Sequence, residues 1–170
     1  IASRLPKWIK ENCIQCGKCV IACPHSALSA ILTEDEMADK NSFVKAIGLK
    51  EKLYKILLSP EDCTGCGVCA KTCPALNKAL EMVGTEDILK EKIDEYNQTI
   101  KLKTCQQTLF SENTTKGIQF KNSLFEFPGA CAGCGETPYL KLLTMVNGSN
   151  LMIANATGCS SIYAGTFGSC

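Results

Sequence analysis

The chain has 170 residues, of which 45% are hydrophobic, and a formal net charge of +1. This balance is typical of a soluble globular protein, since no basic stripe indicates nucleic-acid binding and no run of about 18 apolar residues indicates a membrane span. The length suits one large domain, or a small domain joined to part of another. The first residue is Ile1 and no signal-peptide pattern follows, so we expect a piece of a longer polypeptide.

Thirteen cysteines are a high count for this length. In a small secreted protein they would indicate a disulfide framework, but an odd number cannot pair completely. Their spacing instead indicates metal binding, for which the thiols must be reduced. We therefore expect a cytoplasmic protein, from an organism with anaerobic metabolism.

Two copies of the pattern C-x2-C-x2-C-x3-C-P begin 50 residues apart, at Cys13 and at Cys63. This is the spacing of bacterial two-cluster ferredoxins, in which the fourth Cys of each run binds the cluster of the other run. The expected ligands of one [4Fe-4S] cluster are Cys13, Cys16, Cys19 and Cys73, and those of the other are Cys63, Cys66, Cys69 and Cys23. A zinc-binding structural domain is the alternative, but two full runs, each ending in Pro, argue against it.

The residues around the runs predict a small mixed domain. Trp8 and Ile9 suggest a short strand at a sheet edge, and residues 26–28 and 78–80 suggest a short helix after each run. His25, a lone histidine beside Pro24, is interpreted as a surface residue and not as a ligand.

The stretch between the runs is longer than a compact ferredoxin needs, so residues 29–49 predict an insertion. Its charged middle, 33–40, predicts a solvated loop or helical turn, and residues 53–58 predict a strand. After the second run, Thr85 can cap a surface helix that continues to Tyr96. Residues 97–122 are polar and irregular, and we place a linker there, between a first domain over 1–96 and a second over 123–170.

The second domain begins with a further cysteine motif. Thr137 as N-cap and Pro138 at the first turn predict a helix that Gly148 closes. Residues 151–154 predict a short buried strand that leads into a Gly- and Ser-rich turn over 155–161. Strand, turn and helix together predict the start of an α/β domain.

Cys131 and Cys134 alone fit a redox dithiol, half a zinc site or half a cluster site. Cys159 adds a third thiol, one short of a closed [4Fe-4S] site. Cys105, Cys170 or a residue beyond this chain could supply the fourth. Glu136 could face a cofactor, although a first-turn Glu that answers the helix dipole is the simpler interpretation.

The order of these motifs resembles one family. Two ferredoxin runs, then the stretch from Gly129 to Tyr139, then the stretch from Ala154 to Ile162, is similar to pyruvate:ferredoxin (flavodoxin) oxidoreductase. The likeness implies an α+β fold: a bacterial-type 2[4Fe-4S] ferredoxin-like domain with an insertion, followed by the beginning of an α/β thiamine-diphosphate-binding domain. It also implies that Cys131, Cys134 and Cys159 bind a third [4Fe-4S] cluster, and that Glu136, Cys159 and Ile162 line the thiamine pocket.

The resemblance implies a reaction as well. The family decarboxylates pyruvate on thiamine diphosphate with Mg2+, transfers the acetyl group to coenzyme A, and passes the electrons to ferredoxin or flavodoxin, usually as a homodimer. The Gly-Asp-Gly and Asn signature that holds magnesium and diphosphate is absent from these residues, and so are the pyruvate-binding domains. We expect these 170 residues alone to be inactive. A ferredoxin-type carrier without catalysis, or an oxidoreductase for another 2-oxoacid, are the alternatives.

Overall fold

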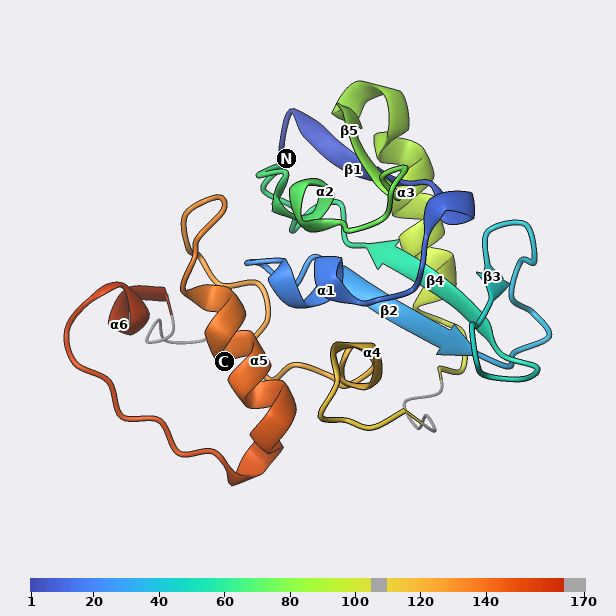
Figure 1. The fold of residues 1–170 in the computed structure, drawn as a ribbon. Helices are drawn as coiled ribbons and strands as arrows, with labels where there is room; N and C mark the ends of the chain where they lie inside the picture. Colours follow the sequence, from blue (N-terminus) through green and yellow to red (C-terminus); the bar gives the residue numbers. More distant parts are fainter. Residues whose placement is uncertain (105–109, 164–170) are drawn as a thin grey trace.

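The computed structural model describes residues 1–104 and 110–163 (Figure 1). Five strands, six α-helices and two 3-10 helices make up these residues. In chain order they are β1 (Arg4–Trp8), η1 (Lys10–Asn12), α1 (Lys18–Ala22), β2 (Leu28–Thr33), β3 (Val44–Lys45), β4 (Leu53–Leu58), α2 (Val68–Thr72), β5 (Leu80–Gly84), α3 (Thr85–Thr99), α4 (Thr115–Ile118), α5 (Thr137–Asn147), η2 (Gly148–Asn150) and α6 (Cys159–Tyr163). None of the helices in this part of the chain is long and apolar enough to cross a bilayer.

Two antiparallel sheets bring the two cysteine runs together. β1, which precedes the first run, pairs with β5, which follows the second run, in a register from Arg4 opposite Gly84 to Trp8 opposite Leu80. β2, which follows the first run, pairs with β4, which precedes the second. Each sheet pairs a strand that flanks the first run with a strand that flanks the second. The runs therefore lie side by side, and α1 and α2 pack against each other (Figure 1).

The helices of the ferredoxin part lie inside the runs, not after them. α1 and α2 each cover the three residues between the third and fourth Cys, where the i, i+4 spacing is about one helical turn. Gly17 and Gly67 precede them with φ of 74° and 75°, which only glycine adopts readily. The helices predicted at 26–28 and 78–80 are therefore wrong. Leu28 and Leu80 instead begin β2 and β5, which pair with β4 and β1, strands distant in the sequence.

The core lies between the sheets and helices of this part. Tyr54 of β4 is fully buried, and its ring meets Trp8 on one side and Phe120 on the other, both edge-on. Leu5 and Leu32 are buried beside it in the same cluster. Trp8 belongs to β1, as predicted, but Ile9 lies outside it.

The predicted insertion is partly strand. Residues 29–33 lie in β2 and pair with β4 along their whole length, so the excursion from the sheet begins after Thr33. Residues 34–43 then form turns in which Met37 is 84% exposed, and β3 returns to the free edge of β4. The prediction of a solvated loop or helical turn over 33–40 agrees with the turns that follow Thr33.

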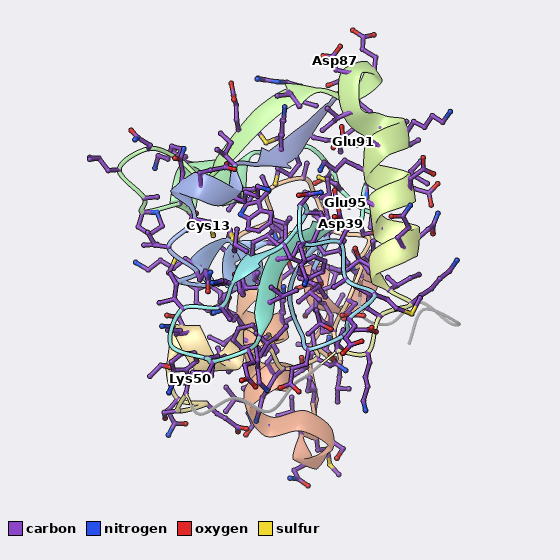
Figure 2. All side chains as sticks on the ribbon, turned by 90° about the vertical axis from the view of Figure 1, so that its right-hand side faces the viewer. Cys13, Asp39, Lys50, Asp87, Glu91 and Glu95 are labelled. Atoms are coloured by element: carbon purple, nitrogen blue, oxygen red, sulfur yellow. The ribbon has the colours of Figure 1, made fainter. Side chains whose placement is uncertain are left out.

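Helix α3 lies along this sheet and bears a row of acidic side chains. Asp87, Glu91 and Glu95 follow one another at four-residue intervals along it (Figure 2). Ile88 of the same helix is buried in the core, and Glu95, two turns further on, reaches Lys55 of β4. The predicted surface helix is confirmed, though it begins at Thr85 itself and runs to Thr99.

Residues 97–122 contribute to the ferredoxin core rather than lying apart from it. The Thr114 hydroxyl caps the short helix α4 by accepting a hydrogen bond from the Gly117 amide. Gln119 and Phe120 directly after α4 are buried, and the Tyr54 hydroxyl donates to Gln119 Oε1 at 2.9 Å. Residues 105–109 of this segment, and with them Cys105, lie outside the described residues.

The last segment packs onto the first cysteine run. Helix α5 contacts α1 and is flanked on its other side by α6 (Figure 1). Its N-cap is Glu136, and Thr137, the predicted cap, is the first helical residue and fully buried. The strand predicted at 151–154 is wrong. Those residues pair with no strand in the described structure, and Met152 is 95% exposed.

Candidate iron-sulfur sites

The thiols of the two runs line two separate cavities, and each cavity takes three thiols from one run and one from the other. The first is lined by Cys13, Cys16, Cys19 and Cys73 together with Trp8 and Tyr54. The second is lined by Cys23, Cys63, Cys66 and Cys69 together with His25 and Met82. These are the two ligand sets that the crossed ferredoxin pattern predicts.

The four thiols of each set surround a space rather than meeting at one point. Among residues 1–104 and 110–163, no three Cys, His, Asp or Glu side chains converge on a position that would suit one metal ion. A cavity walled by four thiols with apolar residues behind them suits a group of several atoms, such as a cube of iron and sulfide. The residues present therefore fit a [4Fe-4S] cluster in each cavity.

Hydrogen-bond donors at the first cavity fit this interpretation. The backbone N–H of Ala79 donates to Cys73 Sγ at 3.4 Å. Trp8 Nε1 is buried near the Cys13 sulfur and partly offsets the rise that burial causes in the pKa of that thiol. Its N–H has no other partner among the described residues and is a donor for a cluster sulfur.

Burial raises the pKa of several of these thiols. Desolvation is the main cause for Cys13, Cys19 and Cys63, and it raises the pKa of Cys69 to about 12. Neighbouring thiols add to the effect. Cys23 raises the pKa of both Cys63 and Cys69, as expected if the last thiol of the first run lies beside the thiols of the second. Thiols of this kind stay protonated at neutral pH unless a metal replaces the proton, so cluster binding would release protons.

The two runs differ at one turn position. Gly65 has φ of 68°, and an added Cβ would lie 2.8 Å from the carbonyl oxygen of Arg4. The first run has Gln15 at this position, with φ of 55°. Its side-chain amide donates to the Lys45 carbonyl and accepts from the Ile47 amide, both at 2.8 Å. The first run thereby holds the excursion between the runs in place.

The third cysteine set lies at the N-terminus of α5. Cys131 and Cys134 are joined by a backbone hydrogen bond from the Cys134 amide to the Cys131 carbonyl, at 3.0 Å. The Cys134 thiol accepts hydrogen bonds from the backbone amides of Thr137 and Glu136, which lower its pKa. A thiol with a lowered pKa is a ready metal ligand or nucleophile.

The Tyr163 side chain lies near two further residues that the sequence assigns to this site, Glu136 and Cys159. It is buried against Phe125, and desolvation followed by the nearby Glu136 carboxylate raises the pKa of its hydroxyl. Cys134 and Cys159 act on the same hydroxyl more weakly, so the structure brings Cys134, Glu136 and Cys159 to one neighbourhood. Glu136 is exposed, and Ile162 is 73% exposed on α6, so a thiamine pocket at these residues would need further walls.

His25 is a residue whose role the sequence pattern missed. It is 4% exposed, so its interpretation as a surface residue is wrong. Its Nδ1 lies 3.1 Å from the Pro128 carbonyl oxygen and its Nε2 lies 3.3 Å from that of Cys131. The ring thus joins the second cavity to the third cysteine set, a contact between residues more than 100 positions apart that no local spacing could reveal.

A glycine of the third set lies directly against the second run. A Cβ added at Gly133 would stand 3.6 Å from Cys66 Cβ and 3.9 Å from the Val68 side chain, which is ordinary contact. The loop from Cys131 to Cys134 therefore lies near Cys66, which lines the second cavity.

Comparison with known proteins shows which protein family the chain is similar to. The model of the 4Fe-4S dicluster domain matches residues 12–77. The chain is 46% identical, over its whole length, to the pyruvate:ferredoxin oxidoreductase of Moorella thermoacetica. It is 45% identical over 97% of its length to the pyruvate-flavodoxin oxidoreductase of Rhodospirillum rubrum, and 45% identical over 99% to the mitochondrial pyruvate dehydrogenase (NADP+) of Euglena gracilis.

The chain matches one segment of the pyruvate:ferredoxin and pyruvate-flavodoxin oxidoreductases. It spans 15% of the length of the Moorella and Rhodospirillum proteins and 9% of the Euglena protein. Its first part is a 4Fe-4S dicluster ferredoxin domain that mixes helices and strands. The likeness to these oxidoreductases continues past residue 77, through the third cysteine set. Cys170, a candidate fourth ligand of that set, lies outside the described residues.

Proposed function

We propose that this chain is the electron-relay segment of a pyruvate:ferredoxin or pyruvate-flavodoxin oxidoreductase. The observation that carries the proposal is the pair of cavities, each walled by three thiols of one run and the fourth thiol of the other. Bound there, two [4Fe-4S] clusters would accept and release electrons one at a time. Cys13, Cys16, Cys19 and Cys73 would hold one cluster, and Cys63, Cys66, Cys69 and Cys23 the other.

The order of electron flow follows from the contact between the third set and the second run. Cys131, Cys134 and Cys159 would hold a third cluster, with the fourth ligand from outside the described residues. Gly133 lies near Cys66, so electrons from this cluster would reach the second-run cluster, held by Cys63, Cys66, Cys69 and Cys23, first. The first-run cluster would follow and would pass them to the acceptor, because its thiols are the ones away from the Cys131 loop.

The whole enzyme would add the chemistry that this segment lacks. By its likeness to the family, it would oxidatively decarboxylate pyruvate with coenzyme A to acetyl-CoA and CO2, using thiamine diphosphate and Mg2+ held mainly by other parts of the protein. Glu136, Cys159 and Ile162 would contribute to the thiamine site. Ferredoxin or flavodoxin would be the acceptor. A homodimer, a cytoplasmic location and an anaerobic metabolism belong to the same proposal.

An anaerobic assay of the full-length protein tests the proposal. With pyruvate and coenzyme A, we expect reduction of a viologen dye, and the ferredoxin part should contain about eight irons in two coupled clusters. Reduction with another 2-oxoacid but not with pyruvate would reassign the substrate. Intact clusters without dye reduction by any 2-oxoacid would favour an electron carrier. Zinc in place of iron, with no EPR signal after reduction, would contradict both.

A further inference from the structure

A buried lysine from the last segment reaches into the ferredoxin part. Lys141, in the middle of α5, is 4% exposed. Its Nζ donates a hydrogen bond of 2.6 Å to the carbonyl oxygen of Val20, in α1. Val20 follows Cys19 directly and lies three residues before Cys23, and a thiol of each cluster set acts electrostatically on the ammonium.

The other buried lysines of the described chain have a carboxylate partner, and Lys141 does not. Lys55 and Lys92 both reach Glu95, at 2.6 and 2.5 Å. Among residues 1–104 and 110–163, no carboxylate lies within ion-pair distance of the Lys141 ammonium. A buried ammonium is costly unless an anion compensates it.

The groups that act on Lys141 are anionic when metal is bound. Desolvation lowers the pKa of Lys141, and Cys23, Glu126 and Cys19 oppose this in decreasing order. Glu126 reaches the surface, but partial burial raises the pKa of its carboxyl, so water screens its charge only in part. The Cys23 and Cys19 thiols, by contrast, line the two cavities. When they bind a cluster they are thiolates, and the cluster with its four thiolates carries net negative charge.

We propose that Lys141 is the fixed countercharge of the ferredoxin clusters, and that it raises their reduction potentials. This inference rests on the proposed function, since it needs the clusters. Reduction adds one electron, and hence one negative charge, to a site that faces the ammonium. A nearby positive charge in a medium of low polarity stabilises the reduced form more than the oxidised one.

The source of this charge couples the two parts of the chain. Lys141 belongs to α5, which follows the third cysteine set, whereas the clusters belong to the runs. The potentials of the ferredoxin part therefore depend on the docking of the segment that would deliver the electrons. Lys141 is a positioning residue for charge and not a ligand.

Redox titration of the anaerobically purified holoprotein, followed by EPR, tests the inference. Lys141→Met keeps the length of the side chain and removes the charge, and we expect the potentials of both ferredoxin clusters to become more negative. Lys141→Arg should keep potentials near those of the wild type. Glu126→Gln, which removes the opposing charge, should shift the potential in the positive direction.

Lys55→Met is the matched control. It also removes a buried ammonium, but Lys55 points to α3, while its neighbours Tyr54 and Ile56 line the first cavity. It should lower stability and leave both potentials unchanged. Full iron content with unchanged potentials in Lys141→Met would overturn this inference alone, as would equal shifts in Lys141→Met and Lys55→Met. A wild-type protein that binds no iron would overturn the proposed function and this inference together.

Discussion

Cys23 and Cys73 each end one run and line the cavity of the other. The Cys-x3-Cys spacing places one turn of helix between the third and fourth thiols, and the helix turns the fourth away from its own run. Pro24 and Pro74 then end the helix, because proline disfavours a helical residue before it. The crossing of ligands is thus a local property of each run, repeated twice.

Replacing a crossing thiol should damage the opposite site. Cys73→Ser is expected to lose or alter the cluster surrounded by Cys13, Cys16 and Cys19, and Cys23→Ser the cluster surrounded by Cys63, Cys66 and Cys69. Iron analysis should fall from about eight towards about four per ferredoxin part, and EPR should lose one of two interacting signals. The two variants serve as controls for each other. Damage confined in each variant to the cluster of its own run would show that the ligand assignment is wrong.

At the scale of secondary-structure elements, strand β4 and helix α3 are joined by a largely buried ion pair between Lys55 and Glu95. Lys55 is 1% exposed and Glu95 is 21% exposed, and Lys92 gives Glu95 a second partner. Burial alone would raise the pKa of Glu95, but the hydrogen bonds from Lys55 and Lys92 outweigh it and hold the pKa below its ordinary value. The carboxylate therefore stabilises the packing of the helix on the sheet while it stays ionised.

Removing this charge should weaken the fold in a pH-dependent way. Glu95→Gln is expected to lower the free energy of unfolding by about 3 kcal/mol at neutral pH, because it leaves Lys55 buried without an anion. The lowered pKa of Glu95 stabilises the fold fully at pH values above the ordinary glutamate pKa of about 4.3. The difference in stability from wild type should therefore shrink as the pH falls below about 4.3 and through the lowered pKa of Glu95. Urea unfolding at several pH values measures it.

Glu91→Gln is the control on the same helix. Glu91 pairs with Lys92 at 3.4 Å but is 67% exposed, so its loss should cost less than about 1 kcal/mol at any pH. Equal losses of stability in the two variants, or a Glu95→Gln deficit that does not shrink as the pH falls below about 4.3, would contradict the role assigned to the buried pair.

At the scale of the whole chain, the segment after residue 122 docks onto the ferredoxin part through backbone carbonyls. The His25 ring faces the carbonyls of Pro128 and Cys131, and the Phe127 amide donates to the His25 carbonyl at 3.2 Å. Ser26 Oγ adds a bond to the Phe125 carbonyl. Carbonyls only accept, so a neutral imidazole can donate to one of its two and a doubly protonated ring to both.

Loosening this contact should free the third cysteine set. His25→Leu is expected to raise the rate of amide hydrogen exchange at Phe127 and Cys134 about fivefold, since one lost hydrogen bond is worth about 1 kcal/mol. Mass spectrometry of the holoprotein measures the exchange. Ser26→Ala, which removes a single bond to the same segment, should have a smaller effect at Cys134. Unchanged protection in His25→Leu would show that other contacts hold the loop.

From cysteine spacing that the chain keeps locally, the sequence predicted the ferredoxin class, the two crossed cysteine sets that line the cavities, and the likeness to a 2-oxoacid oxidoreductase. It also predicted α3 from helical periodicity. It mistook the residues after each run for helices, because the strands there are defined by partners 20 to 80 positions away, such as Arg4 opposite Gly84 and Leu28 opposite Leu58.

The residues that surround the thiols could be identified only from the tertiary structure. Lys141 and Val20 are 121 positions apart and His25 and Pro128 are 103 apart, and nothing in the residues near either pair marks them as partners. A lysine in an amphipathic helix and a histidine beside a proline are ordinary surface residues by pattern. Burial made them neighbours of the cluster sites, because the chain folds α5 and the loop before it against the runs.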